Sequence, residues 1–222
     1  GVRLAIAHIA TPEAMEVLKK ARAAGQEVYA ETCPHYLYLT EETVLKYGPF
    51  AKCNPPLRSA EDRDKLWDYI NDGTVDYIGS DHGSFLVSEK EKGNKDIFTA
   101  AAGSACIEMS VPLMLTAVRD GKLTLARMMQ LMCENPARIF GLKTKGSLLP
   151  GMDGDFVLCD TEKEFTVDHK DFLTQGRDIS GWYDGMKLIG KPEMTCVRGR
   201  IVMENGVVDH GAKGWGKLIR KD

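Results

Sequence analysis

The sequence predicts an α/β fold, in which short parallel strands alternate with helices. Three short apolar runs, of the kind that forms buried strands, occupy residues 4–9, 28–33 and 75–79. Segments with helical signals separate these runs. Because strands that are joined through helices pair in parallel, the alternation predicts a parallel sheet of about three strands.

Capping residues mark the helices between these runs. Thr11 precedes a segment that opens with Pro and Glu, and Gly25 follows it, which predicts a helix between them. Ser59, with Asp62 three residues later, resembles a capping box and predicts a second helix that ends at the Asn-Asp-Gly of residues 71–73. The polar segment SEKEKGNKD, residues 88–96, is expected to form a surface loop.

The composition changes near Gly146, where we place a domain boundary. Before it, three segments have helical patterns, at residues 107–118, 125–133 and 136–140. After it, Gly and Asp become frequent and short β-like runs appear at residues 156–159, 194–197 and 201–203. The sequence therefore predicts a first domain over residues 1–145 and a β-rich appendage with a tail over residues 146–222.

Composition and charge exclude several classes of protein. The 222 residues carry a formal net charge of -3, so no basic field is present to bind nucleic acid. No apolar run approaches the roughly 20 residues of a membrane span. The six cysteines form no CxxC pair, which favours free thiols and a cytoplasmic location. The chain begins without Met inside an apolar run, so we expect it to be part of a longer protein.

Two polar residues stand at the carboxyl ends of predicted strands. His8 ends the first apolar run and Asp81 follows the third. In a barrel of alternating strands and helices the active site is built at that end. An imidazole and a carboxylate that converge there suit a divalent metal, commonly zinc. The alternative is that His8 hydrogen-bonds a carbonyl and Asp81 caps a turn, because two isolated residues define no metal motif.

Two further positions are candidates for substrate contact. Asn54 precedes two prolines in a stiff turn, where its amide could meet a ligand, although a plain turn explains the pattern as well. Gly103 lies among small residues that could let a ligand approach the backbone, and tight helix packing is the alternative.

Several segments together resemble the cyclic amidohydrolases, which include hydantoinases, dihydropyrimidinases, allantoinases and dihydroorotases. They occur in family order and span nearly the whole chain: AHIATPEAMEVLKKARAAGQEVYAETCPHYL, KCNPPLR, DKLWDYINDGTVDYIGSDHGSF, NPARIFGL and KGSLLPGMDGDFVL. The resemblance implies the carboxyl-terminal portion of an amidohydrolase-type TIM barrel, about three strands, with part of a small β-sandwich domain. It also implies a homo-oligomer, a dimer or a tetramer, when the enzyme is intact.

The resemblance assigns a role to each candidate residue. It makes His8 a metal ligand, Asp81 a metal ligand and the catalytic proton shuttle, and Asn54 and Gly103 substrate contacts. His82, next to Asp81, would help to hold that ligand in position without binding the metal itself. The family's other ligands, an early HxH pair, a carboxylated Lys and a further His, match nothing in this chain. The resemblance therefore implies binuclear zinc in the intact enzyme and an inactive chain in isolation.

The implied activity is the metal-dependent hydrolytic opening of a cyclic amide. Phe85 stands where dihydroorotases have a second histidine suited to a substrate carboxylate, whereas Asn54 is dihydroorotase-like. We expect a ureide or hydantoin ring, allantoin first, with dihydropyrimidines and dihydroorotate as other possibilities. The alternative is a non-catalytic, dihydropyrimidinase-like assembly protein, against which the presence of both His8 and Asp81 argues.

Overall fold

The computed structural model describes residues 1–219 and divides them into two compact units. Unit 1 comprises residues 1–110 and 166–187, and unit 2 comprises residues 111–165 and 188–219. The division expected at residue 146 stays a prediction. None of the helices within residues 1–219 combines the length and the apolarity that crossing a membrane would require.

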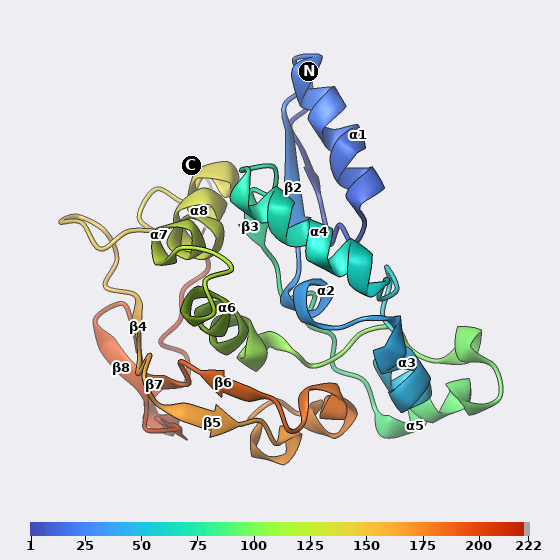
Figure 1. The fold of residues 1–222 in the computed structure, drawn as a ribbon. Helices are drawn as coiled ribbons and strands as arrows, with labels where there is room; N and C mark the ends of the chain where they lie inside the picture. Colours follow the sequence, from blue (N-terminus) through green and yellow to red (C-terminus); the bar gives the residue numbers. More distant parts are fainter. Residues whose placement is uncertain (220–222) are drawn as a thin grey trace. The chain divides into compact units, whose positions relative to one another are not determined.

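A three-stranded parallel sheet forms the centre of unit 1 (Figure 1). Its strands are β1 (Leu4–Ile6), β2 (Val28–Thr32) and β3 (Tyr77–Ile78), in the order β1-β2-β3. Both pairings are parallel. The strand–helix alternation of the sequence therefore predicted the pairing of all three strands correctly.

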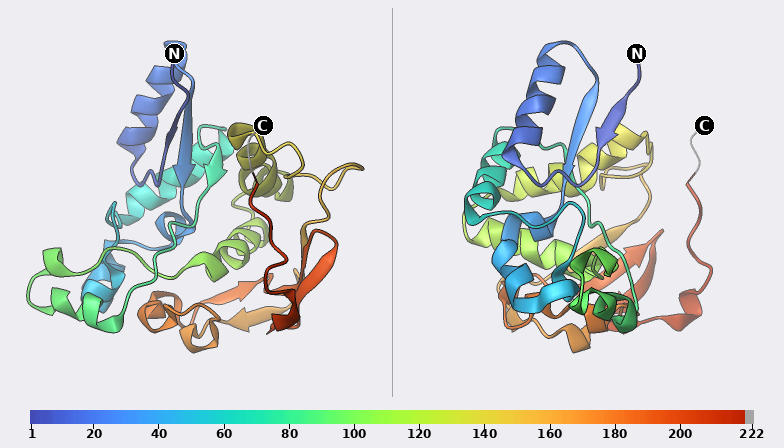
Figure 2. Two further views of the ribbon diagram at one scale, coloured as in Figure 1. Left: turned by 180° about the vertical axis from the view of Figure 1, so that it is seen from behind. Right: turned by 90° about the vertical axis from the view of Figure 1, so that its right-hand side faces the viewer.

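Two helices, α1 (Pro12–Ala23) and α4 (Ala60–Asn71), pack together beside this sheet (Figures 1 and 2). Both predicted caps are present, because Thr11 Oγ1 accepts the Ala14 N–H at 3.3 Å and Ser59 Oγ accepts the Asp62 N–H at 3.1 Å. The buried faces of the two helices supply much of the core of unit 1: Met15, Leu18, Leu66, Trp67 and Ile70.

Arg22, in the last turn of α1, joins the helix to the strands. Its guanidinium donates to the carbonyl of Val28 at 2.9 Å, to the carbonyl of Thr74 at 2.7 Å and to the Asp76 carboxylate. The same carboxylate accepts the Ala30 N–H at 2.7 Å. These part-buried hydrogen bonds hold the end of α1 against the start of β2 and the approach to β3.

The first strand differs from its prediction. The run at residues 4–9 was expected to be buried on both faces, but β1 covers only Leu4–Ile6 and all its residues are exposed. Leu4 is 47% exposed and Val2, just before the strand, is 83% exposed. The reason is its place in the sheet, since β1 is an edge strand among the described residues.

Three short helices complete the regular structure of unit 1: α2 (Pro34–Tyr38), α3 (Glu41–Tyr47) and α5 (Val87–Glu91). Residues 88–96 were expected to form a surface loop, and most of them are exposed, but they begin in α5 and continue in a 3-10 turn. Lys90 in α5 is fully buried and donates to the Lys52 carbonyl at 3.0 Å. The charged segment of residues 88–96 therefore contains one lysine side chain that is buried within unit 1.

Unit 2 contains the later helices and an antiparallel sheet. The helices are α6 (Ser110–Arg119), α7 (Leu125–Met129) and α8 (Asn135–Phe140), and α7 and α8 are joined by one π-helical turn, Gln130–Glu134. Pro136, which has no N–H for the regular helical ladder, lies just after that turn. These elements match the predicted helices.

The predicted β-rich character after residue 146 is also present. A four-stranded sheet has the order β4-β7-β8-β9, all antiparallel, with β4 (Phe156–Cys159), β7 (Pro192–Val197), β8 (Arg200–Glu204) and β9 (Val207–Val208). Two further short strands, β5 (Glu164–Thr166) and β6 (Lys187–Ile189), pair with each other and lie where the chain passes between the units.

Candidate active site

His8 lies just beyond the carboxyl end of β1, in a backbone conformation that is unusual for its residue type. Its φ is 41°, in the left-handed region. Its backbone N–H donates to Glu31 Oε1 at 3.1 Å. Its Nδ1 is buried and finds no hydrogen-bond partner among the described residues. The alternative in which this imidazole bonds a carbonyl through Nδ1 is therefore not what the structure has.

Asp81 lies three residues after the end of β3 and has a backbone conformation like that of His8. Its φ is 48°, again in the left-handed region. Partial burial raises the pKa of its carboxyl group, and the nearby His8 offsets part of that rise. The two residues thus leave parallel strands at the same edge of the sheet and interact electrostatically. That both side chains point into one cavity stays a prediction.

The donor set at this edge suits a divalent metal. A buried polar atom without a partner carries a cost of about 1–3 kcal/mol, which a ligand to that atom removes. The Nδ1 of His8 is such an atom, and an imidazole nitrogen with a carboxylate is a normal partial ligand set for zinc. His8 and Asp81 therefore fit two positions of a metal site.

Glu31 is a member of this site that the sequence did not reveal. Besides accepting the His8 N–H, its carboxylate lies against Gly79, where a Cβ would come within 2.4 Å of Glu31 Cδ. The carboxylate therefore sits between the segments that leave β1 and β3. Gly79, a residue without a side chain at a strand end, was the available signal.

Gly103 is hydrogen-bonded to the backbone of Lys52, two residues before Asn54. The Gly103 N–H donates to the Lys52 carbonyl at 2.9 Å, and the Lys90 ammonium donates to the same oxygen at 3.0 Å. Gly103 has φ 133°, and a Cβ there would lie 3.0 Å from Cε2 of Phe85. The Phe85 ring therefore lies close to the Gly103 backbone, and the approach of a ligand to Gly103 stays a prediction.

Asn54 itself is exposed, two residues after Lys52. The following Pro55 carbonyl is held by two donors, the Tyr36 hydroxyl at 2.9 Å and the Cys53 thiol at 3.2 Å. The turn is therefore firmly anchored while the Asn54 side chain stays accessible.

Both ring nitrogens of His82 form hydrogen bonds with nearby residues. Its Nδ1 accepts the Ile107 N–H at 3.1 Å, which leaves Nε2 protonated and 3.2 Å from Ser84 Oγ. Its backbone forms a parallel bridge with Ser104, next to Gly103. His82 thus connects the end of β3 to the Gly103 segment, and its role behind Asp81 stays a prediction.

The thiols near Asp81 are neutral. Burial raises the pKa of Cys53 to about 11 and that of Cys106 to about 12, and the Asp81 charge adds to both shifts. The Cys106 thiol donates to the Ser80 carbonyl at 3.0 Å. Both thiols are therefore uncharged at neutral pH while they lie within the electrostatic influence of Asp81.

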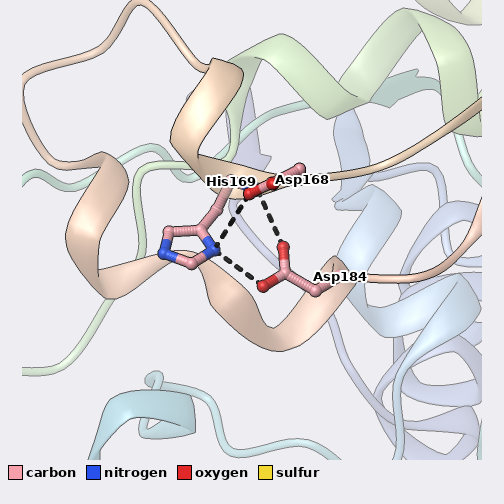
Figure 3. A group of neighbouring side chains, drawn as sticks. All are labelled: Asp168, His169 and Asp184. Atoms are coloured by element: carbon pink, nitrogen blue, oxygen red, sulfur yellow. Dashed lines mark hydrogen bonds and ion pairs between the residues drawn. The ribbon is translucent and has the colours of Figure 1, made fainter.

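Two other histidines lie outside the candidate ligands. His35 is buried in α2 with an unpartnered Nε2, and burial lowers its pKa to about 3. The Nδ1 of His169 bonds Asp184 Oδ2 at 2.7 Å, and Asp168 lies beside it (Figure 3). This group borders a cavity of about 390 Å³ in unit 1, and its internal hydrogen bonds account for the arrangement.

The comparisons with known proteins agree with this geometry. Residues 1–202 match the family described as "Amidohydrolase family". An L-hydantoinase of Paenarthrobacter aurescens is 39% identical over 223 residues, 100% of this chain and 48% of that protein. A dihydroorotase of Acetivibrio thermocellus is 35% identical over 208 residues, 93% of this chain and 47% of that protein.

Solved structures give the same result. The D-hydantoinase (dihydropyrimidinase) from Thermus sp. has a TM-score of 0.91 and 29% identity over 98% of this chain and 48% of that one. The chain belongs to the amidohydrolase family. Within it, the chain is a member of the cyclic amidohydrolases, as the sequence resemblance predicted, and has their α/β fold. It spans about half the length of the curated relatives it matches.

Proposed function

We propose that this chain forms part of a metal-dependent enzyme that opens a cyclic amide by hydrolysis. The observation that carries the proposal is the buried, unpartnered Nδ1 of His8, coupled electrostatically to Asp81 at one edge of a parallel sheet. Membership of the cyclic amidohydrolases supports it.

In this proposal His8 and Asp81 would hold the metal. A divalent cation held there would supply Lewis-acid chemistry toward a carbonyl group and toward water. Asp81 accepts the proton of the attacking water and returns it to the leaving ring nitrogen.

Asn54 and Gly103 would orient the ring. The exposed Asn54 amide offers a donor and an acceptor, which match the carbonyl and the N–H of a cyclic amide. The Gly103 N–H is already used by Lys52, so Gly103 offers its carbonyl oxygen as an acceptor for a ring N–H.

The substrate we propose is a hydantoin-type ring, allantoin first. A relative named L-hydantoinase supports such a ring. Phe85, which packs against Gly103, offers no partner for the carboxylate of a dihydroorotate. Dihydropyrimidines and dihydroorotate are the other rings to be tested.

The rest of the enzyme would supply what this chain lacks. We propose that residues 1–145 complete a TIM barrel with the strands that carry the other ligands, the HxH pair, the carboxylated Lys and a further His. Residues 146–222 would belong to a small β-sandwich, and the whole enzyme would be a dimer or a tetramer. The exposed edge of β1 supports a further strand beside it.

Two substitutions in the full-length enzyme test the metal and proton roles. Asp81→Asn keeps one ligating oxygen but cannot accept the proton, so metal content should fall only partly while turnover falls by roughly 10²–10⁴. His8→Ala removes a ligand, so metal content and activity should fall together and excess metal should restore part of both.

The measurements are metal analysis and ring-opening rates on allantoin, hydantoin, dihydrouracil and dihydroorotate, from the same preparations. Near wild-type turnover by Asp81→Asn would contradict the proton role. A full-length protein that binds no zinc and opens none of the rings would favour the non-catalytic assembly protein instead.

A further inference from the structure

Glu31 occupies a place between the two proposed ligands that the hydrolytic mechanism does not explain. It belongs to β2, the central strand, whose neighbours β1 and β3 lead to His8 and Asp81. Its side chain is only partly accessible to solvent. A carboxylate in such a position needs hydrogen-bond partners, and besides the His8 N–H these include the Cys33 thiol, which donates to Oε1 at 3.9 Å, and the Tyr77 side chain.

Glu31 accepts hydrogen bonds from two successive backbone amides in the segment that follows β1. Its side-chain Oε1 accepts the His8 N–H at 3.1 Å, and its backbone carbonyl accepts the Ile9 N–H at 2.8 Å. The neighbouring Thr32 hydroxyl donates to the Ile9 carbonyl at 2.7 Å. The end of β1 is therefore fixed by consecutive residues of β2.

The hydrogen bond from the His8 N–H to the Glu31 carboxylate lies at a residue with a strained backbone conformation. A residue other than Gly in the left-handed region costs on the order of 1–2 kcal/mol, and it persists only where its surroundings hold it. His8 has φ 41°, and the Glu31 carboxylate is bonded to its amide. The imidazole of this residue has a buried Nδ1 without a hydrogen-bond partner among the described residues.

Gly79 leaves the space in which this carboxylate lies. A Cβ at Gly79 would come within 2.4 Å of Cδ and 2.6 Å of Oε1 of Glu31, closer than any real contact. The Gly79 N–H also donates to the Thr32 carbonyl at 2.9 Å, so the backbone has little freedom to retreat. The Glu31 carboxylate thus fits between the segments that follow β1 and β3 because position 79 has no side chain.

We infer that Glu31 is the positioning residue of this site, whose carboxylate holds His8 in the conformation that presents its imidazole. The inference rests on the proposed function, because that proposal supplies the metal that His8 would bind. The contact between Glu31 and His8 does not depend on a metal. Two readouts separate them: zinc affinity, and the exchange of single amides in the metal-free protein.

Amide exchange tests the contact without metal. In full-length Glu31→Ala, the His8 amide should exchange about tenfold faster or more, because it loses its acceptor. The Ile9 amide should stay within about twofold of wild type, because its acceptor is the backbone of Glu31. The two adjacent amides serve as measurement and internal control in one molecule.

Zinc affinity tests the consequence for the site. Glu31→Ala and Gly79→Ala, which remove or displace the carboxylate, should weaken zinc binding by about 10–100-fold. Glu31→Gln keeps an acceptor oxygen and should stay within about threefold. Glu27→Ala is the matched control, since Glu27 lies just before β2 with its side chain 53% exposed, and it should bind zinc as wild type does.

Each outcome decides the inference. Unchanged exchange at His8 in Glu31→Ala would overturn it, as would equal losses of zinc affinity in Glu31→Gln and Glu31→Ala, which would assign the effect to charge. If Gly79→Ala fails to fold, the two Glu31 variants still decide. A wild-type protein that binds no zinc would refute the proposed function, while the exchange of the His8 amide would still test the grip of Glu31.

Discussion

Replacing Gly103 by Ala tests how closely the proposed substrate-binding segment is packed. Gly103 has φ 133°, a conformation that glycine adopts freely and other residues adopt only with strain. A methyl group there would lie 3.0 Å from Cε2 of Phe85, so the ring would have to move. The Gly103 N–H is held by the Lys52 carbonyl, which resists a shift of the backbone.

The expected cost has two parts. The backbone conformation contributes about 1–3 kcal/mol of lost stability. Displacing the Phe85 ring from its rotamer adds about 0.5–1.5 kcal/mol. We therefore expect Gly103→Ala to lower the free energy of unfolding by about 2–4 kcal/mol. Gly73→Ala is the control, because Gly73 has φ 88° with open space around it, and it should cost only the backbone part, about 1–3 kcal/mol.

Urea unfolding of the full-length protein measures both changes. A cycle with Phe85→Leu separates the parts, because a smaller side chain removes the collision and leaves the backbone cost. The reasoning is refuted if Gly103→Ala unfolds within about 0.5 kcal/mol of wild type, or if the Phe85→Leu background leaves its cost unchanged.

Three further predictions concern a charge pair, a buried lysine and the chain itself. Arg22→Met should lower the free energy of unfolding by about 3 kcal/mol, because it removes the donor to two carbonyls and the charge that faces the part-buried Asp76 carboxylate, whereas Arg3→Met, at an exposed pair, should cost under about 1 kcal/mol in the same urea titration. Burial lowers the pKa of Lys90 from 10.5 to about 8, so the unfolded state holds more protons between these values and stability should rise with pH there, a slope that Lys90→Met should remove. The isolated 222-residue chain should dimerise or aggregate through its exposed strand edge and open no ring with zinc added, and measured turnover by it would contradict this.

The pH prediction for Lys90 depends on its surroundings. Burial is the main cause of the lowered pKa, the Cys53 thiol acts against it, and Lys52 adds to it. Because the pKa of Cys53 is raised to about 11, that thiol is neutral over most of the window and does not hold the lysine charged. Unfolding curves from pH 7 to 10.5 that show no difference between wild type and Lys90→Met would contradict the expected burial of the charge.

The sequence by itself determined the local elements and their order. Thr11 and Ser59 mark the starts of α1 and α4 because a side-chain oxygen can satisfy a helix N–H only a few residues away. The alternation of strands and helices implied parallel pairing, and it placed His8 and Asp81 after strands of one sheet. The family followed from motifs that occur in order along the chain.

Only the tertiary structure decided which distant groups meet. Glu31 and Gly79 are separated by 48 positions, yet the absence of a side chain at one makes room for the carboxylate of the other. Lys90 is buried rather than solvated because the Lys52 carbonyl, which also receives the Gly103 N–H, lies within its reach. Such contacts depend on how strands and loops pack in space, and a local pattern of residue types carries no record of that packing.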